Sequence, residues 1–431
     1  MVFFLSGLIL TNGNLRYVWL PLVFVCASVS SLFAGDPTSE KRPNFLLHDI
    51  HGKQYHGPLQ AILPDWTCQL KSGQATKVLG KHVLFLNRDK LSLPPFPKQS
   101  QFILTSGDRF AFEKAFGIQQ VGGKFQIRSP MQFGEKPRID FIPRAVVSVL
   151  WLGNKGPLSP EVEIRKLLKR PRKTDEVYLH NGDRIDGIFI SLDHKAGCKI
   201  RLQKSNLQIP FRAIKAIAFQ SDLLFRMPTK KPLARLVLTN GSRLMISAAK
   251  LNETGTRMIV TTPWGTAPWS LPLSNVVAID WQDTNAVPLS ALKPSGYKHT
   301  PFFGEQLPYV PDGSVNGSAL SIGTSTFSRG IGLGCGSEIR FRLDGKYQWF
   351  DTTIGMDGMT GRKGQAVLSL LLDGKPAELL DRLRWSAGKG AYRLRISVQG
   401  VREIVLKVDY GEKGNVQGHV NWANSVLITG Q

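Results

Sequence analysis

The chain has few acidic residues for its length. Asp and Glu together number 32 against 55 Lys and Arg, so the 431 residues carry a formal net charge of +23. This excess indicates attraction to anionic partners, which include acidic polysaccharides, membrane surfaces and nucleic acids. The shortage of carboxylates also argues against a glycosidase, because such an enzyme needs two of them placed across a sugar.

Cysteine is scarce as well, with four in the whole chain. Cys26 lies in the N-terminal apolar segment, and the other three are the widely spaced Cys68, Cys198 and Cys335. No C-x-x-C pair exists, so neither a structural zinc site nor a disulfide framework is indicated. We expect three small buried thiols, and we expect neither a metal nor a cofactor.

Catalytic motifs are missing too. The sequence contains no G-x-S-x-G elbow, no H-E-x-x-H and no Walker glycine loop. The glycines at Gly330, Gly332 and Gly334 do not follow a strand and open a helix, so they indicate backbone freedom near a β turn. We therefore expect a protein that is not an enzyme and has no catalytic residues. No aromatic and basic signature of an RNA-binding motif is present, and we expect no nucleic-acid partner.

Residues 1–34 have the pattern of a secretory signal peptide. Arg16 precedes the apolar run Val18–Ala27, and small residues and a break follow at Ala34–Pro37. The apolar core is shorter than the roughly 20 residues of a membrane span. The expected location is therefore secreted or periplasmic. The alternative is an uncleaved N-terminal anchor, because an earlier apolar run at Phe3–Leu10 adds to the hydrophobic length.

The region from about Asn44 to Asp283 is internally repeated. Residues 101–110, 176–185 and 235–244 each contain an apolar strand, a tight turn on glycine, an arginine and another apolar residue, and residues 45–54 are a fainter copy. Such a pattern is typical of one supersecondary unit used several times.

Each repeat also ends alike, at residues 140–149, 208–217 and 270–279. A proline stands where a strand starts or lies at an edge, and the next few residues can form one short turn before a closing strand. These patterns predict meanders of four or five strands. They close into small SH3-like or Sm-like barrels or, as the alternative, pack on their neighbours.

A basic run lies between two of these repeats, at Glu161–Lys173. The pattern fits one short helix that stops before Pro171, since the residue before a proline avoids the helical region. One interpretation is an anion-binding patch, and the other is a solvated linker.

The last third of the chain reads as an all-β module. Residues 338–343, 391–398 and 403–408 alternate apolar and polar side chains, as half-buried strands do. Asp344-Gly345 and Asp373-Gly374 lie between apolar strands, which is a hairpin signal. The predicted fold class is therefore all-β, with a C-terminal β-sandwich of jelly-roll type after the repeated small barrels.

Four segments of this module fall in the order found in a known family: Gly330–Leu333, Ser337–Ile339, Phe350–Asp357 and Gly418–Asn424. The stretch from about Val287 to Ile428 thus resembles the NPCBM family of carbohydrate-binding modules. Residues 289–292 and 297–301 also resemble the lead-in of its secreted planctomycete members. The resemblance implies a β-sandwich that binds carbohydrate.

The chain departs from that family at two motifs. Gly334 and Cys335 stand where the family has a histidine, and three acids of the terminal motif are neutral here. The candidate carbohydrate-binding residues are nevertheless His419, Asn421 and Trp422 of that motif, together with Asp357. Trp349 and Trp385 are further candidates.

Sugar binding needs an aromatic platform and rigid planar polar groups, which these residue types supply. The competing interpretations are that Trp422 is a core residue and that Asp357 only holds a turn.

We thus expect a secreted, non-catalytic carbohydrate-binding protein whose ligand is an anionic polysaccharide or cell-envelope glycan, with peripheral association with an anionic surface. The alternative is a structural or interaction protein of the cell envelope without sugar binding. The expected divisions are a signal peptide at 1–34, β repeats at 44–160, a basic linker at 161–175, β repeats at 176–283, a linker with a lead-in strand at 284–312 and the sandwich at 313–431.

Overall fold

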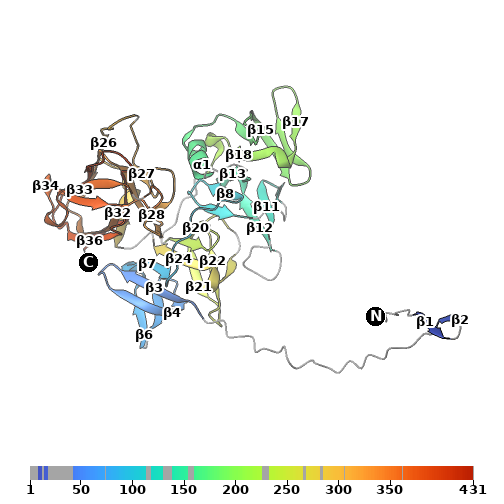
Figure 1. Cartoon of the computed structure of the whole chain (residues 1–431), viewed down its shortest axis with the longest axis horizontal. Coiled ribbons are helices and arrows are strands. Elements are labelled where there is room, and N and C mark those ends of the chain that lie inside the picture. The colour runs from blue at the N-terminus through green and yellow to red at the C-terminus, as the bar shows by residue number, and fades with distance from the viewer. Residues whose placement is uncertain are drawn as a thin grey trace. The chain divides into compact units, whose positions relative to one another are not determined.

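The computed structural model describes residues 8–11, 14–17, 42–72, 74–112, 118–129, 138–153, 160–225, 233–265, 268–281, 285–304, 306–361 and 363–430. Residues 1–41 form one unit and residues 42–431 another (Figure 1). In the first unit, β1 (Leu8–Thr11) and β2 (Asn14–Tyr17) pair as an antiparallel hairpin. The rest of the predicted signal peptide lies outside the described residues.

The second unit begins with four successive barrel-like repeats of five or six strands. In each, the first and last strands pair antiparallel. The first repeat consists of β3 (Asn44–Asp49), β4 (Gln54–Ile62), β5 (Cys68–Ser72), β6 (Gln74–Val78) and β7 (Val83–Arg88). The second consists of β8 (Gln101–Leu104), β9 (Arg109–Ala111), β10 (Ile118–Val121), β11 (Lys124–Ser129), β12 (Arg138–Pro143) and β13 (Val147–Trp151).

The third and fourth repeats follow the same plan. The third consists of β14 (Asp175–Leu179), β15 (Arg184–Asp193), β16 (Gly197–Arg201), β17 (Asn206–Ile209) and β18 (Ile214–Ala218). The fourth consists of β19 (Ala234–Leu238), β20 (Arg243–Ile246), β21 (Ala248–Leu251), β22 (Arg257–Thr261), β23 (Trp269–Pro272) and β24 (Val276–Trp281). The predicted repeated barrel-like units are therefore confirmed.

The repeated sequence signals correspond to repeated backbone features. The turn glycines all have φ between +83° and +100°, which side chains avoid, at Gly52, Gly107, Gly182 and Gly241. The prolines precede one 3-10 turn and then the closing strand, as predicted. These turns are η3 (Arg144–Val146), η4 (Phe211–Ala213) and η6 (Leu273–Asn275), and η1 (Gly80–His82) takes the same place in the first repeat.

The repeats pair through their closing strands. β7 pairs with β24, and β13 pairs with β18, both antiparallel. Their buried apolar residues belong to one large cluster that runs through all four repeats. The barrels are therefore closed and also packed on one another, so the two alternatives for the repeats both hold.

The basic segment between the second and third repeats begins with helix α1 (Pro160–Lys169), which ends before Pro171 as predicted. Ile164 is fully buried and packs in a cluster with Trp151. Glu161, also buried, lies 2.9 Å from the guanidinium of Arg109. The segment is thus a helix fixed on the repeats by apolar and ionic contacts, and the solvated-linker interpretation does not fit it.

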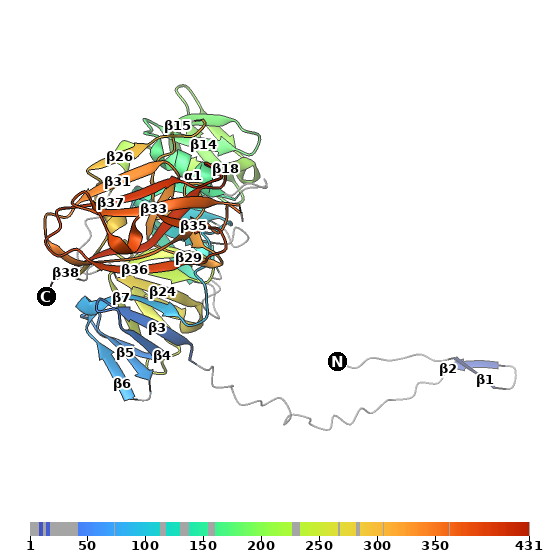
Figure 2. The same cartoon turned by 60° about the vertical axis from the view of Figure 1, so that its left-hand side comes forward.

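Two facing sheets form the C-terminal sandwich (Figure 2). One contains β27 (Val310–Pro311), β30 (Gly330–Gly334), β38 (His419–Thr429), β32 (Tyr347–Met356) and β36 (Tyr392–Ser397), with β25 (Ala286–Pro288) beside β38. The other contains β26 (Gly296–His299), β31 (Ser337–Arg342), β37 (Glu403–Tyr410), β33 (Gln365–Leu372) and β34 (Lys375–Pro376), with β35 (Leu383–Ser386) beside β33. β28 (Leu320–Ile322) and β29 (Ser325–Phe327) form a separate hairpin.

The segment expected as a linker with a lead-in strand at 284–312 contributes three strands to this sandwich. β25 pairs with β38, β26 with β31 and β27 with β30. The prolines and glycines that suggested a linker lie between short strands or at their ends, as with Pro288, Gly296 and Pro311, where a break in pairing is tolerated.

The two Asp-Gly turns differ in outcome. Asp373-Gly374 joins β33 to β34, which pair as a hairpin, as predicted. Asp344-Gly345 has similar positive φ values, yet it connects β31 to β32 in the opposite sheet. Both edges of β31 are already taken by β26 and β37, so the hairpin predicted here is wrong.

An apolar cluster joins the repeats to the sandwich. Its buried members are Ile50, Leu84, Ala286, Val426 and Ile428. A guanidinium N–H of Arg395 also donates to the carbonyl oxygen of Ile50 at 2.6 Å. Cys68, Cys198 and Cys335 are free and buried, as predicted. Within the described ranges, no helix has the length and apolarity to cross a membrane.

Candidate functional site

The terminal motif occupies the first residues of β38. Val420 and Trp422 belong to the sandwich core, and Trp422 is 0% exposed. Because side chains alternate along a strand, His419 and Asn421 point to the opposite face. A fully buried indole has no ring face for a sugar. Trp422 is therefore a core residue, which was the competing interpretation.

Asp357 and Asn421 are buried too, at 1% and 0% exposure. The Asp357 carboxylate accepts hydrogen bonds from the hydroxyls of Ser314 and Ser321, from Asn316 Nδ2 at 2.8 Å and from the backbone N–H of Met359 at 3.1 Å. Asn421 Nδ2 donates to the carbonyl oxygen of Ser321 at 2.8 Å. Both side chains thus fasten the segment 314–321 to the sandwich.

We expect Asp357→Asn to destabilise the sandwich by about 1–3 kcal/mol. The substitution replaces one acceptor oxygen by an N–H₂ group, which cannot accept the hydrogen bonds that this oxygen received. Chemical denaturation of the full chain measures this. Asp344→Asn is the matched control, since Asp344 lies in an exposed turn with positive φ that asparagine tolerates, and its effect should stay within about 0.5 kcal/mol. Unchanged stability with lost glycan binding would instead give Asp357 a direct ligand role.

Of the four residues His419, Asn421, Trp422 and Asp357, only His419 lines a cavity among those described for the sandwich. This cavity of about 220 Å³ also contains His299, Phe302, Phe303 and Tyr410 in its wall. Phe303 is 78% exposed and Phe302 is 53% exposed, and their rings meet edge to face with centroids 4.8 Å apart. His419 therefore stands beside two accessible aromatic rings that the sequence motifs did not indicate.

Burial favours the neutral form of the His419 imidazole. Burial lowers its pKa, because it disfavours the charged ring, and the nearby charge of Asp357 only partly opposes this effect. Nδ1 of His419 is buried and has no hydrogen-bond partner within the described part of the chain. This cavity wall can thus offer one polar atom of a neutral ring to a bound group.

A larger cavity of about 420 Å³ shares one lining residue, Tyr410, with the first. It is lined by residues from β33, β35 and the end of β37, including Trp385 and Tyr410. Strand register explains the arrangement, since Ala366 of β33 pairs with Trp385 on one side and with Tyr410 on the other. Two aromatic rings thus flank one small residue.

The larger cavity is basic. Arg382, Arg384 and Lys389 line it against the single carboxylate of Glu412, which pairs with Arg384 at 2.7 Å. Lys389 Nζ lies 5.5 Å from the centroid of the Trp385 ring. Arg382 has no carboxylate partner among the residues that the structure describes. Aromatic surface and unneutralised cations meet here, which suits a ligand with both an apolar face and negative charge.

Of the two further candidates, Trp385 lines this cavity and Trp349 does not. Trp349 lies on β32, is 38% exposed and packs against the guanidinium of Arg395 at 5.2 Å from the ring centroid. Within the described ranges, no three or more Asp, Glu, His or Cys residues form a cluster that could hold a metal ion.

Comparison with protein families identifies this module. Residues 285–428 match the family model of the NPCBM/NEW2 domain. This segment is an NPCBM/NEW2 domain. The match begins at the strand β25, which agrees with the inclusion of the lead-in strands in the sandwich. The four repeats lie outside the matched residues of the NPCBM/NEW2 domain.

The similar proteins match this chain over only part of one or both sequences. A protein of Renibacterium salmoninarum named as an endo-alpha-N-acetylgalactosaminidase is 30% identical over 113 residues, which are 26% of this chain and 7% of that protein. The chain thus spans a small fraction of this curated relative.

Two solved structures are also similar. One is the CBM51 module of Clostridium perfringens GH95 with methyl-galactose, at 23% identity, TM-score 0.30 and coverage of 33% of this chain and 99% of that one. The other is the tandem CBM51 modules of the family 98 glycoside hydrolase of Streptococcus pneumoniae, at 12% identity, TM-score 0.29 and coverage of 77% and 88%.

Proposed function

We propose that the protein binds carbohydrate without acting on it, and that its ligand is an anionic glycan held at the two cavities beside Tyr410. The observation that carries this proposal is the larger cavity, where Trp385 and Tyr410 lie among three cations and one carboxylate. The NPCBM/NEW2 domain supports carbohydrate as the ligand class.

The chemistry of the lining fits an acidic sugar. The C–H face of a sugar packs on an aromatic ring, and a carboxylate or sulfate binds arginine through charge-assisted hydrogen bonds. Because Tyr410 lines both cavities, a chain of several sugar units can extend from Trp385 toward His419 and Phe303. In this proposal His419 contacts the ligand, whereas Asn421, Trp422 and Asp357 maintain the scaffold behind it.

The net charge of +23 supports the same ligand class, because a basic surface concentrates polyanions near the site. We further propose that residues 1–34 direct export, which would bring the protein to secreted or cell-envelope glycans.

The test compares sulfated and uronic acid oligosaccharides with neutral ones in isothermal titration of the full chain. We expect the acidic ligands to bind more tightly. Their affinity should fall as salt rises from about 50 to 500 mM, because the Debye length then shortens from roughly 14 to 4 Å. Some affinity should remain, because salt does not screen the aromatic contacts. Equal affinity for neutral ligands would remove the anionic part of the proposal.

Failure to bind any glycan would remove the carbohydrate proposal altogether. Envelope proteins that co-purify under the same conditions would then favour the alternative, a structural or interaction role in the cell envelope. Two measurements separate these outcomes: a titration with a glycan set reports the first, and a pull-down from envelope extract reports the second.

A further inference from the structure

A separate cavity lies in the repeats, far along the chain from the NPCBM/NEW2 domain. It has a volume of about 280 Å³ and is lined by residues of α1, β13, β14 and β18, including Trp151, Tyr178, Ala216 and Lys166. Strand register builds it, since Ala216 of β18 pairs with Trp151 of β13 on one side and with Tyr178 of β14 on the other. A small residue between two aromatic ones leaves a hollow that α1 borders.

The deep end of the hollow has an unused hydrogen-bond donor. Trp151 is 0% exposed, and its indole N–H has no acceptor among the residues that the structure describes. A buried N–H without a partner is unfavourable, because it has lost its hydrogen bonds to water. The ring also lies 5.7 Å from Lys215 Nζ, measured to its centroid. An acceptor atom on a bound molecule would satisfy this donor.

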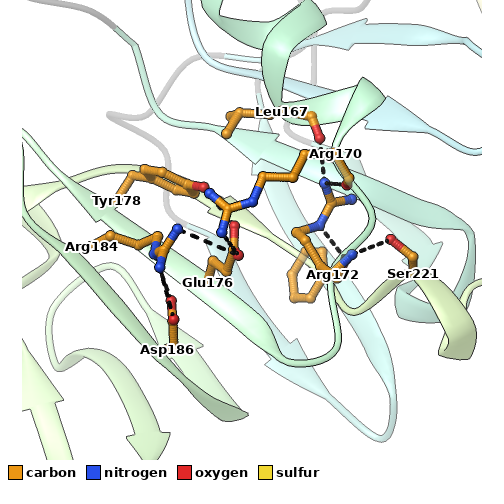
Figure 3. Close-up of polar contacts among 9 residues, drawn as sticks. Leu167, Arg170, Arg172, Glu176, Tyr178, Arg184, Asp186 and Ser221 are labelled. Atoms are coloured by element: carbon orange, nitrogen blue, oxygen red, sulfur yellow. Dashed lines mark hydrogen bonds and ion pairs between the residues drawn. The ribbon is translucent and has the colours of Figure 1, made fainter.

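The hydroxyl of Tyr178 is already engaged. It donates to Glu176 Oε2 at 2.5 Å, and Figure 3 shows Arg170 and Arg184 directed at the same carboxylate. The guanidiniums of Arg170 and Arg184 lie 3.3 and 4.0 Å from Glu176 Oε1. Tyr178 therefore has its ring, and not its hydroxyl, left for a ligand.

The rim of the hollow is cationic. Lys166, Arg170, Lys215 and Glu163 line it; Lys215 pairs with Glu163, and Arg170 pairs with Glu176, which is not among the lining residues. Lys166 is exposed and has no carboxylate partner within the described ranges. The wall between rim and floor is apolar, with Leu167, Leu179 and Ala216. Its volume lies just below the roughly 300–1,000 Å³ of pockets that hold drug-sized molecules, so it suits one ring.

We propose that this hollow binds a small organic anion that consists of one ring and one carboxylate. The ring lies against Tyr178 and Leu179, the carboxylate faces Lys166 and Arg170, and an oxygen accepts the indole N–H of Trp151. Such a group can be a free aromatic acid or the acidic sugar unit of a glycan, since both consist of one six-membered ring with one carboxylate. The proposal does not depend on glycan binding by the NPCBM/NEW2 domain.

The test uses benzoate and glucuronate as probes of the two sources, with the full chain labelled with ¹⁵N. The chain contains nine tryptophans, and the indole N–H signal that disappears in Trp151→Phe belongs to Trp151. We expect one or both probes to shift this signal in a saturable titration. A shift with benzoate alone identifies an aromatic acid, and a shift with glucuronate alone identifies an acidic sugar.

Lys166→Gln changes an exposed residue, so the variant should fold, and we expect it to weaken probe binding about fivefold. Lys204→Gln is the matched control, because Lys204 is exposed in the β16–β17 hairpin and does not line the hollow. The proposal is overturned if neither probe moves the Trp151 signal, or if the two lysine variants weaken binding equally. Binding that survives in Trp385→Ala separates this site from the one in the NPCBM/NEW2 domain.

Discussion

Trp385→Ala should weaken binding of an acidic oligosaccharide about 30-fold or more. Removal of an aromatic anchor at the centre of a binding surface typically costs about 2 kcal/mol or more. The ring of Trp385 lies 5.5 Å from that of Tyr392, centroid to centroid, and also contacts Lys389. Its removal eliminates an aromatic surface for the sugar and leaves the cations of the cavity in place. Isothermal titration with one sulfated or uronic acid oligosaccharide measures the change.

Trp349→Ala is the matched control for this variant. Trp349 is also a partly exposed tryptophan of the sandwich, but it does not line the cavity. We expect its affinity to stay within about twofold of the unchanged chain, and circular dichroism should report the same β content for both variants. Equal losses in the two variants, or no loss in Trp385→Ala, would remove the cavity as the ligand site.

Trp422→Ala should destabilise the sandwich by about 3–5 kcal/mol. The side chain is fully buried in a core that includes Ile331, Ile354 and Leu427, and truncation of a large aromatic residue leaves a cavity that the surroundings fill only in part. For a module of this size the loss lowers the unfolding temperature by about 10 °C. Thermal and denaturant unfolding of the full chain measure it.

Trp422→Phe separates a core role from a ligand role. It keeps most of the apolar volume, so we expect a smaller loss of stability and glycan affinity within about twofold of the unchanged chain. A folded Trp422→Phe variant that no longer binds glycan would show instead that the indole of Trp422 takes part in recognition.

The strand pattern was the best-predicted feature of the fold. In β31, Ile339 and Phe341 are buried while Arg340 and Arg342 are exposed, as the period of two indicates. The repeats were visible because each one reuses the same glycine turn, and three of them reuse a proline before the closing strand. The change of sheet after Asp344-Gly345 was not predictable, because turn chemistry fixes the local backbone and not the sheet that the next strand joins.

The candidate site was harder to predict. The family motif drew attention to residues 418–424, but Trp422 lies in the core. Strand alternation places Val420 and Trp422 on the same face, so a core position for Trp422 could have been predicted from the sequence. The cavity beside Trp385 had no such signal. Its lining comes from residues 365–367, 382–389 and 410–412, which only the pairing of β35, β33 and β37 brings together.

The most direct measurement is a crystal structure of the full chain with a bound sulfated or uronic acid disaccharide. We expect the sugar ring on Trp385 or Tyr410, with its acidic group near Arg382, Arg384 or Lys389. A disaccharide bound away from both cavities that Tyr410 lines, or cleaved in the crystal, would contradict the proposal that this surface binds anionic glycan without catalysis.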